Sequence, residues 1–400
     1  MSVVKAPKIL LPNSEISLEK WAVIACDQYT SEPEYWQQLS NHVGDEPSTL
    51  HMIFPEVYLE DHATERIKAI NQTMRQYQRE SRFQELDECF ILVDRSTHLH
   101  PHRLGLVIAI DLEAYDYADH TNALIRATEK TVVSRIPPRV MIRQDATIEI
   151  PHVQLLMNDP KRHIIEPIYA NKESLKKVYD FELNANGGHV TGYQITNTEP
   201  IINQLESLID ENHLQFIVGD GNHSLATAKT CWENVKKNIP AWQRNDHPSR
   251  YAMVELINLY DDGLEFEPIH RVVFSVDDAF VDGLKALATG HSDCYLYQHK
   301  IGKGPFPITD NAPIAIEKVQ HYIDTYLSTH PKSTVDYVHG DDSLIAICKK
   351  HPNAIGISLP KIDKNDIFTY VSEHGVLPRK SFSMGEAFEK RYYLESRKIK

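Results

Sequence analysis

The sequence predicts an α/β fold (mixed α+β), in which mixed sheets are flanked by helices. Three observations lead to this prediction. Short, uninterrupted apolar runs recur along the 400 residues and are typical of buried strands. Longer polar segments between them carry apolar residues at a spacing near 3.6, which is typical of helices. The two patterns alternate, and such alternation indicates sheets covered by helices.

Each element follows from its local pattern. Strands are expected at the apolar runs 90–93, 104–112, 153–157, 214–218 and 251–259. Helices are expected where the spacing is helical, at 61–83, 196–213, 225–237, 276–288 and 317–330. Residues 335–349 are predicted to form a hairpin that turns at 339–342.

The length and one loop-like stretch predict the domain organisation. Chains of this length usually hold two domains, or one large domain with additions. The Pro- and Gly-containing stretch 301–313 is the best linker candidate. We therefore expect a main α/β body at 1–300 and a C-terminal α/β segment at 301–400 packed on it.

Composition and charge exclude several classes of protein. Hydrophobic residues make up 42% of the chain and charged residues 24%, which excludes a disordered chain. The formal net charge of −14 argues against a general nucleic-acid binder, since such proteins need a basic excess to neutralise phosphates. No apolar run approaches the roughly 18 residues of a membrane span, and no signal peptide is evident. We expect a cytoplasmic protein without nucleic-acid or membrane partners, and a homo-oligomer is left open.

The densest polar cluster is the segment Gly219–Ser224, with the sequence GDGNHS. It lies between an apolar run and a predicted helix, where unpaired backbone N–H groups attract anions. Gly219 and Gly221 allow close backbone approach or positive φ. Asp220 is suited to hold a metal ion or to act as a general base. Further donors at the same rim come from Asn222, His223 and Ser224. Helix capping alone would explain one polar residue, but not the whole cluster.

A second segment is basic in an otherwise acidic protein. Arginine guanidinium groups suit phosphate and carboxylate oxygens. The alternative is a solvated surface on which Glu129 and Asp145 pair with the cations. The five cations within 18 residues are Arg126, Lys130, Arg135, Arg139 and Arg143.

Several shorter polar positions are further candidates. Lys229 lies near the second turn of the helix after the GDGNHS segment. His270 and Arg271 open an apolar strand, for which a structural strand-end role is the alternative. Asp27 ends a short apolar run in a polar cluster. Neither a Walker A loop nor a GxGxxG, GxSxG or HExxH motif is present in the sequence.

Long stretches of the sequence resemble one bacterial and archaeal family, the domain-of-unknown-function family number 1015. The resemblance spans nearly the whole chain. The stretches that carry it are WAVIACDQYTSEPEYW at 21–36, GLVIAIDLEAYDY at 105–117, RIPPR at 135–139, GDGNHSLATAK at 219–229, PIHRVVF at 268–274 and RKSFSMGEAFEKRYYLE at 379–395.

A second resemblance concerns residues 220–224. Many members of that family carry Asp-Gly-His-His-Arg there, which is similar to the signature of free-serine kinases in the ParB/sulfiredoxin-like superfamily. Those enzymes move a phosphoryl group from a nucleotide to the hydroxyl of free L-serine. The resemblance implies a ParB/sulfiredoxin-like core, with Asp220 at the metal or acting as the base. It also implies that His223 lies near the transferred phosphate.

Two positions depart from this signature. Asn222 replaces its first His, and Ser224 replaces its Arg. The loss of that Arg removes a bidentate phosphate contact. Candidates to supply the missing cation are Arg126, Lys130 and Arg271.

The sequence therefore predicts a Mg²⁺- and nucleotide-dependent phosphotransferase that acts on a small hydroxylated metabolite, with free L-serine as the leading acceptor and ATP or ADP as the donor. The predicted catalytic residues are Asp220, His223, Asn222 and Glu129, and the predicted metal ligands are Asp220 and Asp27. The predicted nucleotide-binding residues are Gly219, Gly221, Ser224, Lys229, Arg126, Lys130, His270 and Arg271. One alternative is a hydrolase of a phosphorylated metabolite that uses the same pocket. Another is a non-catalytic nucleotide-sensing protein, in which the departures from the signature mark a lost site.

Overall fold

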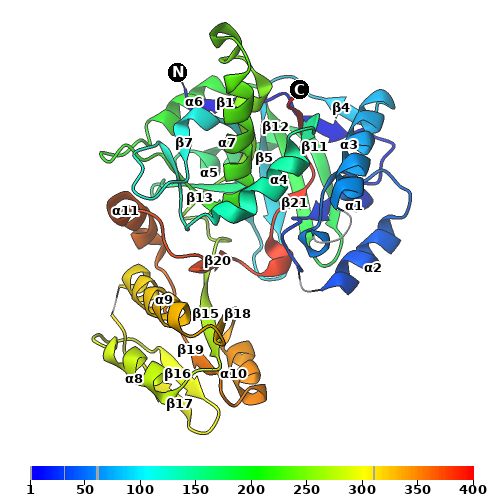
Figure 1. Cartoon of the computed structure of the whole chain (residues 1–400). Helices are drawn as coiled ribbons and strands as arrows, with labels where there is room; N and C mark the ends of the chain where they lie inside the picture. Colours follow the sequence, from blue (N-terminus) through cyan, green and yellow to red (C-terminus); the bar gives the residue numbers. More distant parts are fainter. Residues whose placement is uncertain (1, 31, 60–62, 310) are drawn as a thin grey trace. The chain divides into compact units, whose positions relative to one another are not determined.

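In the computed structural model, which describes residues 2–30, 32–59, 63–309 and 311–400, the apolar runs become the central strands of a large mixed sheet (Figure 1). Among these residues the sheet has ten strands in the order β11-β12-β5-β6-β14-β10-β13-β8-β7, with β1 beside β6. The pairs β10–β14, β13–β8 and β7–β8 are parallel, and the others are antiparallel. The strands are β1 Val4–Lys5, β5 Phe90–Ser96, β6 Arg103–Asp111, β7 Tyr115–Asp116, β8 Ile125–Ala127, β10 Gln154–Met157, β11 Lys176–Leu183, β12 Gly188–Ile195, β13 Phe216–Asp220 and β14 Tyr251–Asn258.

Helices cover both faces of this sheet. Phe90 and Leu92 on β5 share a core with α5, α6 and α7, whereas Ile91 and Val93 share a core with α1, α2 and α3. Because both faces are buried, the strand sequence is an uninterrupted apolar run instead of an alternating one. The helices are α1 Leu18–Trp21, α2 Pro33–Val43, α3 Ala63–Arg79, α4 Ile136–Arg143, α5 Ile165–Ala170, α6 Glu199–Glu206 and α7 Asn222–Lys237.

The chain divides into two units, and the division differs from the expected boundary at residue 300. Unit 1 comprises Met1–Ala127, Thr131–Leu264 and Glu386–Lys400, and unit 2 comprises Thr128–Lys130 and Glu265–Gly385. The C-terminal segment thus returns to unit 1. No change of composition marks these crossings, because the return depends on strand pairs between segments that are distant in sequence.

The C-terminal segment of unit 1 is held by short two-stranded pairings. Strand β21 pairs with β3 and β22 pairs with β9, while the backbone of Ser396 exchanges hydrogen bonds with Leu10 at 2.7 and 3.0 Å. A third small sheet joins β2 to β4. Their bounds are β2 Leu10–Pro12, β3 Val23–Ile24, β4 Phe83–Glu85, β9 Ile148–Glu149, β21 Tyr392–Tyr393 and β22 Arg397–Lys398.

Unit 2 is a smaller antiparallel sheet with helices. Its strand order is β17-β16-β19-β15-β18, and β20 also pairs with β15. The strands are β15 Phe266–Phe274, β16 Tyr295–Gln298, β17 Gly302–Pro305, β18 Thr334–His339, β19 Ile355–Ile357 and β20 Phe382–Met384. The helices are α8 Asp278–Ala286, α9 Ala312–Thr329, α10 Asp341–Lys350 and α11 Lys364–His374.

The predicted α/β class is confirmed, but two local predictions are wrong. Residues 335–349 are not a hairpin, since helix α10 follows β18. Leu344 and Cys348 lie four residues apart and are both buried on one helical face, a spacing that also fits a strand in so short a segment. The stretch 301–313 is not a linker, because it contains β17 and the start of α9.

Two helix predictions need shorter statements. The helix predicted at 196–213 is confined to α6, Glu199–Glu206. The first two residues of the helix predicted at 61–83 lie outside the described residues, and α3 ends at Arg79. In the described part of the chain, no helix combines the length and apolar character needed to cross a membrane.

Glu149 links the middle of unit 1 to its C-terminal segment. Its carboxylate accepts hydrogen bonds from Arg397 Nε at 2.6 Å, from Met253 N–H at 2.8 Å and from Arg143. The residue is buried. Burial alone would raise the pKa of Glu149, but the charges of Arg397 and Arg143 lower it below its ordinary value. The ionised carboxylate is therefore part of the folded state.

We expect Glu149→Gln to lower the free energy of unfolding by about 3–5 kcal/mol at neutral pH, because two guanidinium groups lose their counter-charge. The lowered pKa means that the parent loses stability as the pH falls below about 4.3, where the unfolded chain binds a proton. The variant should lose less over that step. Urea unfolding at pH 7 and in acid measures both effects. Glu85→Gln, at a half-exposed pair with Lys398, is the control, and equal losses in the two variants would contradict the prediction.

Candidate functional site

The GDGNHS segment forms the turn between β13 and α7. Gly221 has a φ of +85°, and a Cβ at this position would lie 3.0 Å from Val153 Cγ2, so glycine is required. Asp220 Oδ1 accepts a hydrogen bond from Gly221 N–H at 2.8 Å. Leu225 N–H donates to Gly221 O at 3.0 Å in the first turn of α7, and the N-terminus of a helix favours anions. Gly219, by contrast, is an ordinary position inside β13.

Lys390 faces Asp220 across this turn. Its Nζ atom lies 3.1 Å from Asp220 Oδ2, and its side chain is only 8% exposed. Burial alone would raise the pKa of Asp220, but the charges of Lys390 and then His152 lower it below its ordinary value. Asp220 is therefore ionised at neutral pH and can bind a cation or accept a proton.

A second carboxylate, that of Asp27, lies close to His152. His152 Nε2 lies 3.7 Å from Asp27 Oδ2, and His152 Nδ1 is 2.7 Å from the hydroxyl of Tyr393. That hydroxyl also contacts Cys26 Sγ at 3.0 Å. His152 thus contacts Asp27, and its charge also contributes to the lowered pKa of Asp220.

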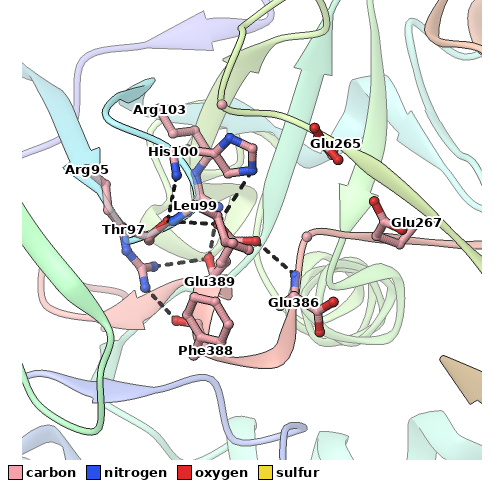
Figure 2. Close-up of polar contacts among 12 residues, drawn as sticks. Arg95, Thr97, Leu99, His100, Arg103, Glu265, Glu267, Glu386, Phe388 and Glu389 are labelled. Carbon is pink, nitrogen blue, oxygen red and sulfur yellow. Dashed lines mark hydrogen bonds and ion pairs between the residues drawn. The ribbon is translucent and has the colours of Figure 1, made fainter. Parts of the chain in front are cut away.

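Two buried arginines hold the segment that carries Lys390 (Figure 2). Arg95 donates to the carbonyl oxygens of Phe388 at 2.7 Å, Glu389 at 3.1 Å and Lys390 at 2.6 Å. Arg103 donates to the carbonyl of Glu389 at 2.8 Å. Burial, and then the charge of Arg103, lower the pKa of Arg95. These bonds fix the backbone at Lys390 and thereby the position of its ammonium group.

The next residue in this segment, Arg391, is held by two buried ion pairs. Its guanidinium pairs with Glu255 on β14 and with Glu395 Oε2 at 2.6 Å, and all three residues are buried. Glycine at position 105 of β6 makes room for the Glu255 carboxylate, because a Cβ there would lie 2.4 Å from Glu255 Oε1. The backbone is therefore held on both sides of Lys390, by the arginine contacts to 388–390 and by the ion pairs of Arg391.

The remaining predicted residues of the turn surround the start of α7. His223 Nε2 accepts a hydrogen bond from Val132 N–H at 3.1 Å, so the basic segment reaches this turn between Lys130 and Arg135. Ser224 lies in the first helical turn and is half-buried. Two buried polar atoms here have no hydrogen-bond partner among the described residues, namely Asn222 Oδ1 and Thr131 Oγ1.

Arg126 and Lys229 have other contacts. The Arg126 guanidinium donates to the carbonyls of Ala123 at 2.9 Å and Asn212 at 2.7 Å, at the end of β13 opposite to Asp220. Lys229 Nζ donates to the carbonyl of Leu112 at 2.9 Å. Lys229 also pairs with Glu233 at 3.1 Å. Both cations thus have partners other than Asp27 and Asp220.

The other four predicted residues belong to unit 2, where their contacts are structural. The buried carboxylate of Glu129 accepts from the N–H groups of Ser381 at 2.8 Å and Lys380 at 3.0 Å, and burial raises its pKa. Lys130 N–H donates to a backbone carbonyl at 2.8 Å. His270 Nδ1 accepts from a backbone N–H at 3.2 Å, and the buried Arg271 donates to Gln320 and to a backbone carbonyl. These bonds engage the side chains of Glu129, His270 and Arg271 within unit 2, whereas the side chain of Lys130 is exposed.

Sequence reasoning missed His152 and Lys390. Each stands beside a segment that the sequence analysis singled out, His152 before an apolar strand and Lys390 inside the motif at 379–395. Neither has a local signature of spacing that would mark it as functional. Their role depends on strand pairings that bring distant segments to Asp220.

The chain belongs to the family described as "Protein of unknown function (DUF1015)", which matches residues 9–366. The family resemblance seen in the sequence is thereby confirmed. No curated protein matches the sequence significantly.

The similarity to solved structures is remote in each of three examples. A conserved hypothetical protein from Pyrococcus furiosus has a TM-score of 0.40 and 11% identity, over 73% of this chain and 95% of that one. A free serine kinase in complex with AMP has a TM-score of 0.41 and 11% identity, over 73% and 92%. SbnI from Staphylococcus aureus, with a C-terminal truncation, has a TM-score of 0.37 and 8% identity, over 70% and 82%. TM-scores this low do not establish a shared fold, so the ParB/sulfiredoxin-like core stays a prediction.

We expect Arg95→Met to lower the free energy of unfolding by about 3 kcal/mol or more, because several buried carbonyls lose a charged donor. Urea unfolding monitored by tryptophan fluorescence measures the loss. Arg82→Met, at an exposed pair with Glu80, is the matched control and should change stability little. Equal stability of the Arg95 variant and the parent would show that Arg95 does not hold this segment.

Proposed function

We propose that the protein is a nucleotide-dependent phosphotransferase, which moves a phosphoryl group from ATP or ADP to the hydroxyl of a small metabolite, with free L-serine as the leading acceptor. The observations that carry the proposal are two pairs, Asp27 with His152 and Asp220 with Lys390, and the second pair lies at the start of α7. Phosphoryl transfer asks a protein mainly for positioning and for charge neutralisation. These pairs supply carboxylates and a cation, and the N-terminus of α7 follows Asp220 directly.

Lys390 has the role that the missing signature arginine would have had. In the resembled signature an Arg stands where this chain has Ser224. The Lys390 ammonium is a point charge next to the N-terminus of α7, where backbone N–H groups also favour phosphate. The site thus keeps a phosphate-binding cation, although the cation comes from the C-terminal segment.

The two carboxylates divide the remaining tasks. Asp27 and Asp220 offer the hard oxygen ligands that Mg²⁺ prefers, and Mg²⁺ usually completes its shell with phosphate oxygens and water. Among the described residues, no group of three or more His, Cys, Asp and Glu side chains that could hold a metal ion is found. We propose that the ion enters with the nucleotide. When bound, it neutralises charge on the transferred group. One carboxylate takes the proton of the acceptor hydroxyl. A bond forms from the hydroxyl oxygen to phosphorus, while the bond between that phosphorus and the nucleotide oxygen breaks.

We expect purified protein with Mg²⁺, ATP or ADP and L-serine to form phosphoserine, measured by mass spectrometry. Asp220→Asn should lower kcat about 100-fold or more, because it removes a proton acceptor and a metal ligand. Lys390→Met should lower it by about 100-fold, because a donor to the transferred phosphoryl group is lost. Lys398→Met, in the same segment but half-exposed, is the matched control and should retain the parent rate.

Other outcomes would contradict the proposal. Phosphate release without an acceptor would indicate a hydrolase. A nucleotide-induced rise in melting temperature without turnover would indicate a sensor. Product formed equally by the parent and Asp220→Asn would place the activity elsewhere.

A further inference from the structure

A half-buried ion pair lies next to the proposed site. Arg139 on α4 pairs with Glu56, which begins a short 3₁₀ helix at Glu56–Tyr58. The side chains are 16% and 19% exposed, so both retain some contact with solvent. Two prolines in the first turn of α4, in the motif RIPPR, fix the start of the helix that carries Arg139.

The backbone connects this pair to Asp27. Glu56 N–H donates to the carbonyl of Cys26 at 2.8 Å, and Asp27 is the next residue. The charges of both pair members also reach the Cys26 thiol: burial, followed by Asp27 and Glu56, raises its pKa, while Arg139 acts in the opposite direction. Glu56 is therefore hydrogen-bonded to the residue that directly precedes Asp27.

The charges of this pair select among ligands. A phosphate group would meet the Arg139 guanidinium, but the Glu56 carboxylate beside it would repel the phosphate. A zwitterion, in contrast, presents one group of each sign. The hydrogen bonds of Arg139 to Glu56 and to the Arg135 carbonyl use two of its five N–H donors, so further donors remain for a carboxylate. Opening a largely buried ion pair is costly when a charge is left unpaired, but a zwitterion supplies a new partner to each member.

We propose that Arg139 and Glu56 bind the carboxylate and the ammonium of a zwitterionic acceptor, a free hydroxylated α-amino acid, and hold its hydroxyl beside Asp27. This inference rests on the proposed function, because Asp27 acts on a hydroxyl only in that reaction. It deepens that function by naming the residues that distinguish an amino acid from other small alcohols. An acceptor that lacks the carboxylate or the ammonium would make only one of these two contacts.

The test measures acceptor binding separately from catalysis. Isothermal titration calorimetry with the full chain gives the Kd of L-serine, and ethanolamine and glycerate are the analogues that lack one charge. Steady-state assays with nucleotide give the KM for L-serine. We expect Arg139→Gln and Glu56→Gln each to raise both values about tenfold or more, because each removes a charge-assisted contact. Arg135→Gln is the matched control, since the exposed side chain of Arg135 makes no part of the pair.

The nucleotide-induced rise in melting temperature shows whether each variant is folded and retains its nucleotide site. With that rise preserved, an unchanged Kd for L-serine in Arg139→Gln and Glu56→Gln overturns the inference. Binding of ethanolamine or glycerate as tight as that of L-serine, or no binding of L-serine, L-threonine or L-homoserine by the parent, also overturns it. Binding of L-serine that depends on Arg139 and Glu56, without phosphoserine formation, supports the inference and refutes the proposed function. Phosphoserine formation with an unchanged KM for L-serine in Arg139→Gln and Glu56→Gln supports the proposed function and overturns the inference.

Discussion

The hydrogen bonds from buried arginines to the C-terminal segment are the interaction on which the rest of unit 1 depends. Arg95 and Arg103 donate hydrogen bonds to the backbone carbonyls of 388–390. Arg391 forms ion pairs with Glu255 and Glu395. These bonds compensate for the desolvation of three cations and two carboxylates, which would otherwise oppose folding strongly. They also place Lys390 where no local sequence preference would put it.

This arrangement couples the stability of the fold to the composition of the site. A buried charge network is costly unless every member is paired, so each member constrains the others. Glycine at position 105 admits the Glu255 carboxylate, Glu255 orients Arg391, and the backbone next to Arg391 sets Lys390. The cation at Asp220 is therefore the last step in a series of packing constraints that begins in the central strands.

The site itself combines opposite charges at close range. Asp220 pairs with Lys390, and Asp27 lies 3.7 Å from His152. In the proposed function, a ligand with complementary charges would exchange with these pairs. The same principle applies to Arg139 and Glu56 in the proposed acceptor site. Because a zwitterion presents one group of each sign, its binding would leave neither member of that pair as a lone charge.

The sequence by itself determined the features that depend on neighbouring residues. The α/β class followed from apolar runs and helical spacing, and the strand-to-helix turn with its positive φ at Gly221 followed from GDGNHS. It misassigned 335–349, because a short amphipathic helix and a strand share the same apolar spacing. Tertiary structure alone decided that Arg126 binds carbonyls at the far end of β13 and that Lys390 meets Asp220. Both outcomes depend on which strands pair, and pairing between distant segments is determined by the burial of whole faces, which no local pattern of residues records.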